Sequence, residues 1–193
     1  MTHKNQPVTI YISAASDLME ERETLARMIA TLPVTLAWKI LQTPVGDERF
    51  DPTLPATADW HVLIMGGDIR APVGSELYAI RRAGRPTVAF LKKEAPRTSA
   101  GLIFVKDAGL RWRSFSGTAS LRRQVQQALA EHLLSNAIRY ALTPEECARL
   151  TAMQTPEEAA AHTAASGTEA GHSAVVLSQE RFTPSEGVIV DEQ

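Results

Sequence analysis

Cysteine is almost absent from this sequence, and so are long hydrophobic stretches. Cys147 is the only cysteine among 193 residues, so no disulfide can form within the chain and no thiolate cluster can hold a metal. No run approaches the roughly 18 apolar residues that a membrane-spanning helix needs. Residues 1–7 also lack the apolar stretch of a secretory leader. We therefore expect a protein of the reducing cytoplasm that neither enters a membrane nor is secreted.

Several common catalytic signatures are missing as well. The five histidines have no metal-like spacing with carboxylates or with the cysteine, so no metal site is expected. The sequence contains no Ser-x-x-Lys, Gly-x-Ser-x-Gly or Walker phosphate-loop motif, which excludes the common serine hydrolases and the P-loop nucleotide hydrolases. Nothing in the sequence indicates a resident cofactor.

The net charge of −2 conceals a difference between the two ends of the chain. Residues 143–193 contain nine acidic and two basic residues, a charge of about −7, which leaves about +5 for residues 1–142. We therefore expect two parts, a folded domain over residues 1–142 and an acidic tail over residues 143–193. The positive excess of the domain is too small to predict binding of duplex DNA, although it favours a small anionic ligand.

Hydrophobic patterning within the first part alternates between strands and helices. Apolar, β-branched and aromatic residues cluster in five segments, which predict strands at residues 8–13, 36–41, 60–65, 87–92 and 110–115. Helices are predicted, mostly from helical spacing of apolar residues, at 17–31, 75–83, 99–107 and 118–142. Residues 42–58 are rich in Pro, Asp and Thr and predict a long loop. The alternation predicts an α/β fold with a parallel sheet of about five strands and helices on both faces.

The tail begins with two near-identical helix starts, Thr-Pro-Glu-Glu at residues 143–146 and again at 155–158. Each has a capping threonine followed by a proline at the first helical position. Helices that start there carry few large apolar residues, so we expect at most loose attachment to the domain. Two later β-branched patches, at residues 174–177 and 187–190, fit either a peptide that adds to a partner's sheet edge or a disordered tail.

Three blocks of the sequence resemble a known family. The first strand and the pattern D-L-x-x-E-R at residues 17–22 are similar to uncharacterised bacterial domains that open with a strand, Ser-Ser-Thr and this same pattern. Residues 58–67 resemble the family's second block, and the segments Gly-Ser-Glu at 74–76 and Gly-Arg-Pro at 84–86 its third. The sequence departs from the family at Ala14, which replaces a serine, and at residues 68–70, where Arg-Tyr-Gly is usual. This family is grouped with TIR domains and nucleoside deoxyribosyltransferases, which implies a Rossmann-like fold of the TIR or flavodoxin type.

The functional interpretation depends most on Glu76. The resemblance implies that Glu76 matches the glutamate at the start of the helix after the central strand of TIR-like domains, and that the protein acts in bacterial signalling or defence. A carboxylate beside an anomeric carbon can stabilise the sugar cation that forms when an N-glycosidic bond breaks, or bond to it. Nicotinamide leaves NAD as a neutral molecule and needs no acid. An ordinary base usually needs one, and Asp59 and Asp68 are the nearby candidates. Alternatively, Glu76 only complements the helix dipole.

Other residues are candidates for substrate binding, each with a structural alternative. Ser13 can bond to a ribose hydroxyl or to local backbone. Gly66 and Gly67 can admit a phosphate or form a plain turn. Arg70 can bind a phosphate or lie in solvent. The full substrate-binding set is Ser13, Asp59, Gly66, Gly67, Asp68, Arg70 and Ser75.

Two classes of function follow. In the first, a TIR-like nucleotide-binding domain hydrolyses the N-glycosidic bond of NAD or a related nucleotide, with Glu76 as the catalytic carboxylate. In the second, a non-catalytic adaptor or sensor uses the tail, residues 143–193, to recruit a protein partner. Self-association is expected in both, because TIR-like domains often work as assemblies. A third class, transfer of deoxyribose between bases, is less favoured because those enzymes usually lack a long acidic tail.

Overall fold

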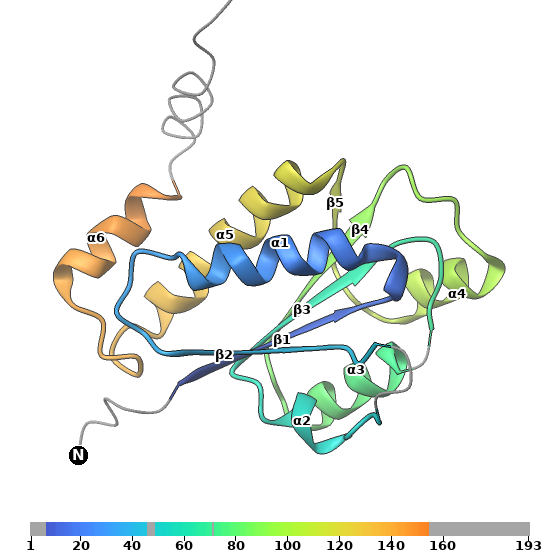
Figure 1. The fold of residues 1–193 in the computed structure, drawn as a ribbon, viewed down its shortest axis with the longest axis horizontal. Coiled ribbons are helices and arrows are strands. Elements are labelled where there is room, and N and C mark those ends of the chain that lie inside the picture. Colours follow the sequence, from blue (N-terminus) through green and yellow to red (C-terminus); the bar gives the residue numbers. More distant parts are fainter. Residues whose placement is uncertain (1–6, 46–48, 71, 155–193) are drawn as a thin grey trace, which may run out of the picture.

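The computed structural model describes residues 7–45, 49–70 and 72–154, in which strands and helices alternate along the chain (Figure 1). The strands are β1 (Val8–Ala14), β2 (Trp38–Gln42), β3 (Trp60–Met65), β4 (Thr87–Lys92) and β5 (Trp112–Phe115). The α-helices are α1 (Met19–Ala30), α2 (Thr53–Ala56), α3 (Val73–Arg82), α4 (Ser99–Asp107), α5 (Thr118–Ser135) and α6 (Pro144–Ala152). A single turn of 3-10 helix, Ser16–Leu18, precedes α1.

The five strands form one parallel sheet in the order β2-β1-β3-β4-β5. The predicted fold is therefore confirmed: this is a Rossmann-like α/β domain with a five-stranded parallel sheet. The strand order reverses between β1 and β3, because β2 lies on one side of β1 and β3 on the other. In sheets of this kind, ligands bind outside the carboxyl ends of the strands at such a reversal.

Helices cover both faces of the sheet, with α1 and α5 on one side and α2 and α3 on the other (Figure 1). Because side chains alternate along a strand, β1 contributes to both layers. Ile10 and Ile12 belong to the main core beneath α1 and α5. Tyr11 and Ser13 face the opposite way, toward α3, and both are buried. The side of the sheet under α3 therefore carries buried polar side chains from β1.

Two predicted elements differ from those observed. The helix predicted to run to residue 142 ends at Ser135, where Asn136 forms the C-terminal cap. Tyr140 folds back against α5, and its hydroxyl lies 2.9 Å from Nε2 of His132. A positive φ of 50° at Ala141 then reverses the chain. The predicted long loop contains the short helix α2, and the amide of its first residue, Thr53, donates to the Asp51 carboxylate at 2.8 Å.

Helix α6 packs against the domain. Leu150 is fully buried in the core that α1 and α5 share. The carboxylate of Glu146 accepts hydrogen bonds from the amide of Thr35 at 2.6 Å and the amide of Thr143 at 2.8 Å. The predicted loose attachment is wrong for this helix, since one buried leucine and one capping glutamate fix it. The second Thr-Pro-Glu-Glu start and the rest of the acidic tail lie outside the described residues.

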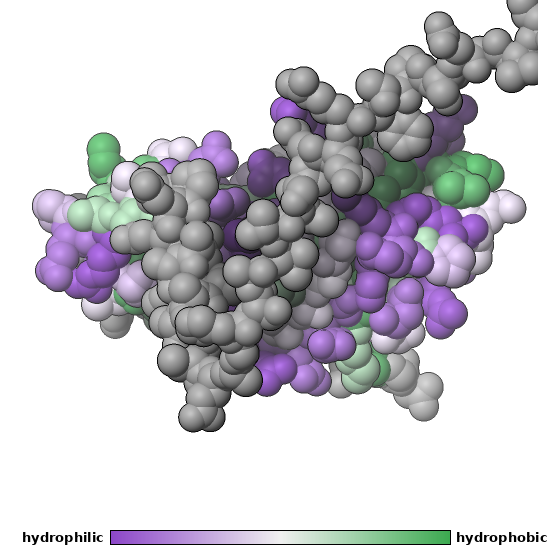
Figure 2. Space-filling model, turned by 90° about the horizontal axis from the view of Figure 1, so that it is seen from above, coloured by the Kyte–Doolittle hydropathy of each residue, from purple (hydrophilic) through white to green (hydrophobic). Residues whose placement is uncertain are grey.

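Seen from the side of α1 and α5, the part of the surface that the structure describes is largely hydrophilic, with a separate hydrophobic patch at the end where α4 lies (Figure 2). Leu102 and Ile103 of α4 are 57% and 61% exposed. None of the helices in the described ranges has the length and apolar character needed to cross a membrane.

Candidate functional site

A cavity of about 340 Å³ lies at the carboxyl ends of the strands, where the strand order reverses. It is lined by residues 14–16 after β1, by residues 43–45 after β2, and by Phe50, Arg70, Pro72 and Val73. Its volume is at the lower end of the range for small-molecule sites. Three loops that follow three adjacent strands therefore form one site, as the sheet topology predicts.

Glu76 lies behind one wall of this cavity. It is in the first turn of α3, where its amide donates to the carbonyl of Pro72 at 3.0 Å, and its side chain is fully buried against β1. The Tyr11 hydroxyl donates to Oε1 at 2.8 Å and the Thr43 hydroxyl donates to Oε2 at 2.9 Å. A third hydrogen bond comes from the side chain of Ser13. Thr43 also lines the cavity, so this residue contacts both the carboxylate and the cavity.

Two opposing effects set the protonation of Glu76. Burial raises the pKa of the carboxyl, and this is the largest effect. Hydrogen bonds from Ser13, Tyr11 and Thr43 and the positive charge of Arg22 lower the pKa, but the net shift is upward. The pKa of Tyr11 is also raised, first by burial and then by the neighbouring carboxylate, so its phenol stays protonated and acts as a donor. The surrounding hydroxyls thus offset part, but not all, of the cost of burying the charged carboxylate.

A buried histidine extends this polar network from β1 across β3 to β4. Nε2 of His61, on β3, lies 2.9 Å from Oγ of Ser13, and Nδ1 lies 3.1 Å from Oγ1 of Thr87 on β4. The Thr87 hydroxyl also lies 3.5 Å from the carbonyl of Arg85. A neutral imidazole donates at one ring nitrogen and accepts at the other, and burial lowers the pKa of His61 to about 3. Hydrogen bonds thus connect Thr87 on β4 through His61 to Ser13, beside Glu76.

Arg22 holds the backbone of Thr43 in place. It is the arginine of the D-L-x-x-E-R pattern, it is buried on α1, and its guanidinium donates to the backbone carbonyl of Thr43. The amide of Ala14 donates to the Thr43 hydroxyl at 3.1 Å. Thr43 is thus held by α1, β1 and α3 together. The glutamate of the same pattern, Glu21, is also buried and accepts a hydrogen bond from Nζ of Lys92 at 2.7 Å.

The structure does not bring Asp59 to this site. Asp59 precedes β3, so it lies at the amino end of the sheet, separated from the cavity by a six-residue strand, roughly 20 Å in length. There it accepts a hydrogen bond from the amide of Thr9 at 2.9 Å and pairs with Arg139. These contacts join the start of the sheet to the chain after α5, so the role of Asp59 in this structure is structural.

The residues after β3 lie at the carboxyl end of the sheet, near the cavity, but they pack against or bond to other groups of the protein. A Cβ on Gly66 would come within 2.7 Å of Asp17, and one on Gly67 within 2.7 Å of the carbonyl of Pro96. The carboxylate of Asp68 accepts from its neighbouring amide, that of Ile69, at 2.8 Å, and from the Thr98 hydroxyl at 2.6 Å. Close packing is thus enough to explain both glycines, and Asp68 fixes the start of α4.

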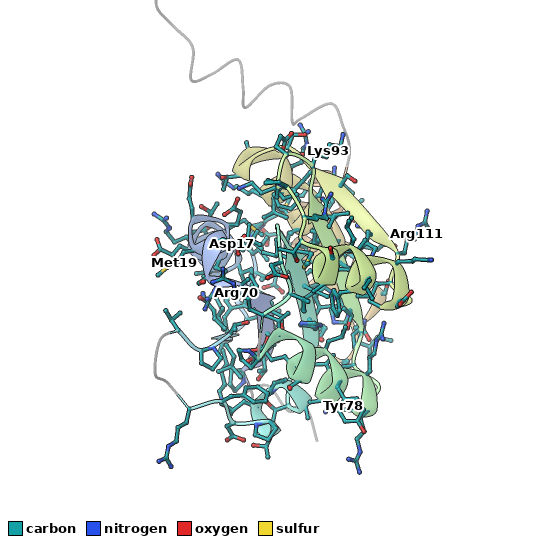
Figure 3. The ribbon with its side chains drawn as sticks, turned by 90° about the vertical axis from the view of Figure 1, so that its right-hand side faces the viewer. Asp17, Met19, Arg70, Tyr78, Lys93 and Arg111 are labelled. Carbon is teal, nitrogen blue, oxygen red and sulfur yellow. The ribbon has the colours of Figure 1, made fainter. Side chains whose placement is uncertain are left out.

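Arg70 and Ser75 lie on opposite sides of the loop that enters α3. Arg70 lines the cavity and is exposed, and Figure 3 shows it at the same end of the sheet as Asp17 and Met19. Ser75 is exposed on the outer side of α3 and lines a different concavity. The sequence-derived set is therefore divided: Arg70 lines the cavity, Glu76 and Ser13 are buried behind it, and Ser75 and Asp59 lie elsewhere.

Sequence analysis missed Tyr11, Thr43, His61 and Arg22 as members of the site. For Tyr11 a signal was present, since Tyr11 and Ser13 are two residues apart in a strand and must share a face. Thr43 gave no signal, because it lies in a segment without periodicity. Among the described residues, no group of three or more His, Cys, Asp or Glu could hold a metal ion.

Comparisons with known proteins add no assignment. The chain matches no protein-family model, and a search of curated proteins finds no significant match.

Proposed function

We propose that this chain is a TIR-like nucleotide-binding domain whose ligand occupies the cavity at the carboxyl ends of β1, β2 and β3. We propose further that Glu76 cleaves the N-glycosidic bond of NAD or a related nucleotide there, in bacterial signalling or defence. The observation that carries the proposal is the position of the Glu76 carboxylate, one side chain away from the cavity, at the reversal of strand order.

Hydroxyl groups around Glu76 suit this chemistry. Its three partners are all side-chain hydroxyls, and a ribose hydroxyl can replace one of them without leaving the carboxylate unpaired. Thr43 is the partner that faces the cavity. In the proposed reaction the Thr43 side chain turns aside when the sugar enters, and the bond between the anomeric carbon and nicotinamide breaks. The carboxylate stabilises the sugar cation or bonds to it, and water then adds to the anomeric carbon and loses a proton to Glu76 or to solvent.

The acids near the cavity favour nicotinamide as the leaving group. Of the two acids considered as proton donors, Asp59 lies at the other end of the sheet, and Asp68 is bonded to Thr98 and to a backbone amide. Nicotinamide departs as a neutral molecule and needs no acid. Arg70, exposed at the cavity, supplies a positive charge for a phosphate of the nucleotide.

Nicotinamide release by the full-length protein tests this proposal. We expect purified protein to release nicotinamide from NAD, and Glu76→Gln to lower the rate by about a hundredfold or more. Glu23→Gln is the matched control, because Glu23 is an exposed carboxylate on α1 whose ion pair within the described part of the chain is with Arg27. Thermal unfolding of the three proteins shows whether a loss of activity reflects a loss of fold.

Binding has to be measured separately from turnover. Calorimetric titration of Glu76→Gln with NAD reports binding without hydrolysis, and Arg70→Ala should weaken that binding. If the wild-type protein binds NAD but releases no nicotinamide at any protein concentration, including those at which it self-associates, the catalytic claim is contradicted and the binding claim stands. If it neither binds nor cleaves NAD, both are contradicted for this nucleotide.

One observation favours a second function, that of a non-catalytic adaptor or sensor with a partner-recruiting tail. Glu76 is 0% exposed, and both of its oxygens already accept hydrogen bonds from protein hydroxyls. Under this proposal the chain captures a partner through its tail without cleaving any nucleotide. The deletion that tests it must begin after Gln154, because α6 is part of the domain core. Partner capture that survives this deletion contradicts the adaptor proposal.

A further inference from the structure

A second concavity lies on the side of α3 that faces away from the sheet. This α2–α3 groove has a volume of about 710 Å³, and its mostly apolar lining includes Phe50, Ala56, Tyr78 and Ala79. Tyr78 is 68% exposed, and Figure 3 shows it on the outer side of α3, pointing away from the rest of the molecule. An exposed aromatic side chain beside an apolar concavity is typical of an interaction surface.

The groove is surrounded mainly by positive charge. Arg82 lines it and is exposed, and Arg49 is exposed next to Phe50. Nε of Arg85 donates to the carbonyl of Ala56 at 3.0 Å, which places a third guanidinium between α2 and α3. One acid, Asp51, is close in sequence, but its carboxylate is bonded to the amide and hydroxyl of Thr53 at 2.8 and 2.7 Å. The groove therefore suits an apolar segment that carries acidic residues.

Two parts of this chain are apolar enough to occupy it. One is α4 of a second copy, through the exposed pair Leu102 and Ile103. The only charges of that helix are Lys106 and Asp107, which cancel. The other is the C-terminal segment, in which residues 155–193 contain seven acidic residues and one basic residue. The two patches Ala-Val-Val-Leu at 174–177 and Gly-Val-Ile-Val at 187–190 are flanked by those acids. Charge complementarity favours the C-terminal segment.

We propose that residues 174–192 bind in the α2–α3 groove of the same chain. A β-branched patch covers Tyr78, and the neighbouring carboxylates face Arg82 and Arg49. The length of the chain permits this contact. Residues 154 and 174 are twenty positions apart, and an extended chain of that length spans up to about 66 Å, whereas a domain of this size has a radius of gyration of only about 15 Å.

This contact places the tail next to the candidate site. Phe50 lines both the groove and the cavity near Glu76, so a segment bound in the groove covers one wall that the two share. A partner that recruits the tail must first displace it from the groove. The proposal does not depend on the catalytic role of Glu76, because the groove and its charges lie outside the Glu76 network.

Site-specific photo-crosslinking in the full-length chain tests the contact. We would incorporate p-benzoylphenylalanine in place of Tyr78, which has similar shape and is exposed, and identify the linked peptide by mass spectrometry. We expect links within one chain to residues 174–192. The same probe in place of Ile138, which is 98% exposed outside the groove, should give no such links.

Charge reversal separates a specific contact from random encounters of the tail. Arg82→Glu, combined with the probe at 78, should lower the yield about fivefold, as expected for the loss of roughly 1 kcal/mol of charge interaction. Arg122→Glu on α5, an exposed arginine outside the groove, is the matched control and should leave the yield unchanged. Links to residues 99–107 of a second chain would instead identify the groove as a self-association surface and overturn the proposal. Absence of links to the tail, or equal links from position 138, would overturn it too.

Discussion

The side-chain hydroxyl of Thr43 joins the candidate carboxylate to the sheet, donating to Oε2 of Glu76 at 2.9 Å and accepting from the amide of Ala14 at 3.1 Å. Thr43→Val keeps the shape of the side chain but removes both bonds. Because the amide and the carboxylate oxygen are buried, we expect the free energy of unfolding to fall by about 1–3 kcal/mol. Urea denaturation of the wild-type and variant proteins measures this difference.

Thr57→Val is the matched control for that experiment. Thr57 is exposed, and its hydroxyl donates to the carbonyl of Leu54 at 2.7 Å, so its replacement should change the free energy of unfolding by less than about 0.5 kcal/mol. Equal effects of the two substitutions would mean that the Thr43 hydroxyl does not hold Glu76 in solution.

The buried histidine predicts a pH dependence of stability. His61 has a pKa of about 3 in the folded protein, against 6.5 when it is exposed. Between these values the unfolded chain binds a proton that the folded chain does not. His61 therefore contributes stability above pH 6.5 that is lost as the pH falls toward 3, with a slope of up to about 1.4 kcal/mol per pH unit.

The variant His61→Gln isolates this effect, because glutamine can donate and accept but does not titrate. The free energy of unfolding of the wild-type protein should fall relative to that of the variant between pH 6.5 and pH 4, measured by urea denaturation. Other groups with shifted pKa values, such as His132, are present in both proteins and cancel in the difference. A difference that does not change with pH would show that His61 is protonated normally in the folded state.

The fold was predictable because its signals are local and repeated. The buried strand β3 is apolar at every position except His61, and α1 carries apolar residues at helical spacing. The end of α5 was not predictable from such signals, because it depends on a tertiary contact between Tyr140 and His132. The docking of α6 likewise depends on Thr35, a residue more than a hundred positions earlier in the chain. Local patterns do not contain contacts of this kind.

The candidate site was predictable only in part. Glu76 was identified because a carboxylate at the start of a helix that follows a central strand has a fixed place in this fold. Tyr11 and His61 could not be identified from the sequence, because the pattern of a strand buried on both faces does not show which of its polar residues meet beneath a helix. Asp59 was misplaced for a different reason. It precedes its strand, and in a parallel sheet that position is the amino end, opposite the cavity.

The position of Asp59 at the amino end of the sheet predicts that its replacement lowers stability but leaves ligand binding unchanged. Asp59→Ala removes the acceptor of the Thr9 amide and the partner of Arg139. We expect the free energy of unfolding to fall by about 1–3 kcal/mol, while the affinity of the folded protein for NAD stays unchanged. Arg70→Ala should do the opposite, weakening NAD binding about tenfold with little effect on stability. Calorimetric titration and urea denaturation of both variants check this. Weaker NAD binding by fully folded Asp59→Ala would contradict the placement.

Glu146 makes the last prediction, because its carboxylate joins the N-terminal cap of α6 to Thr35 of the domain. Its carboxylate bonds to the amide and hydroxyl of Thr35 and to the amide of Thr143, and these bonds lower its pKa to about 2. Glu146→Ala should lower the free energy of unfolding by about 0.5–2 kcal/mol at neutral pH. Glu145→Ala, which removes an exposed partner of Arg149 in the same turn, should lower it by less than about 0.5 kcal/mol.

The lowered pKa of Glu146 also predicts how the stability difference between wild type and Glu146→Ala changes with pH. A carboxyl whose pKa is lowered on folding contributes stability above its ordinary value of 4.5, and that contribution is lost as the pH falls toward 2. The difference in stability between wild type and Glu146→Ala should therefore shrink below pH 4.5, while the difference for Glu145→Ala stays small throughout. Hydrogen exchange of the α6 amides should also become faster in Glu146→Ala, since the helix loses its attachment to Thr35. Unchanged protection of those amides would mean that the other contacts of α6, such as the buried Leu150, hold it on the domain without Glu146.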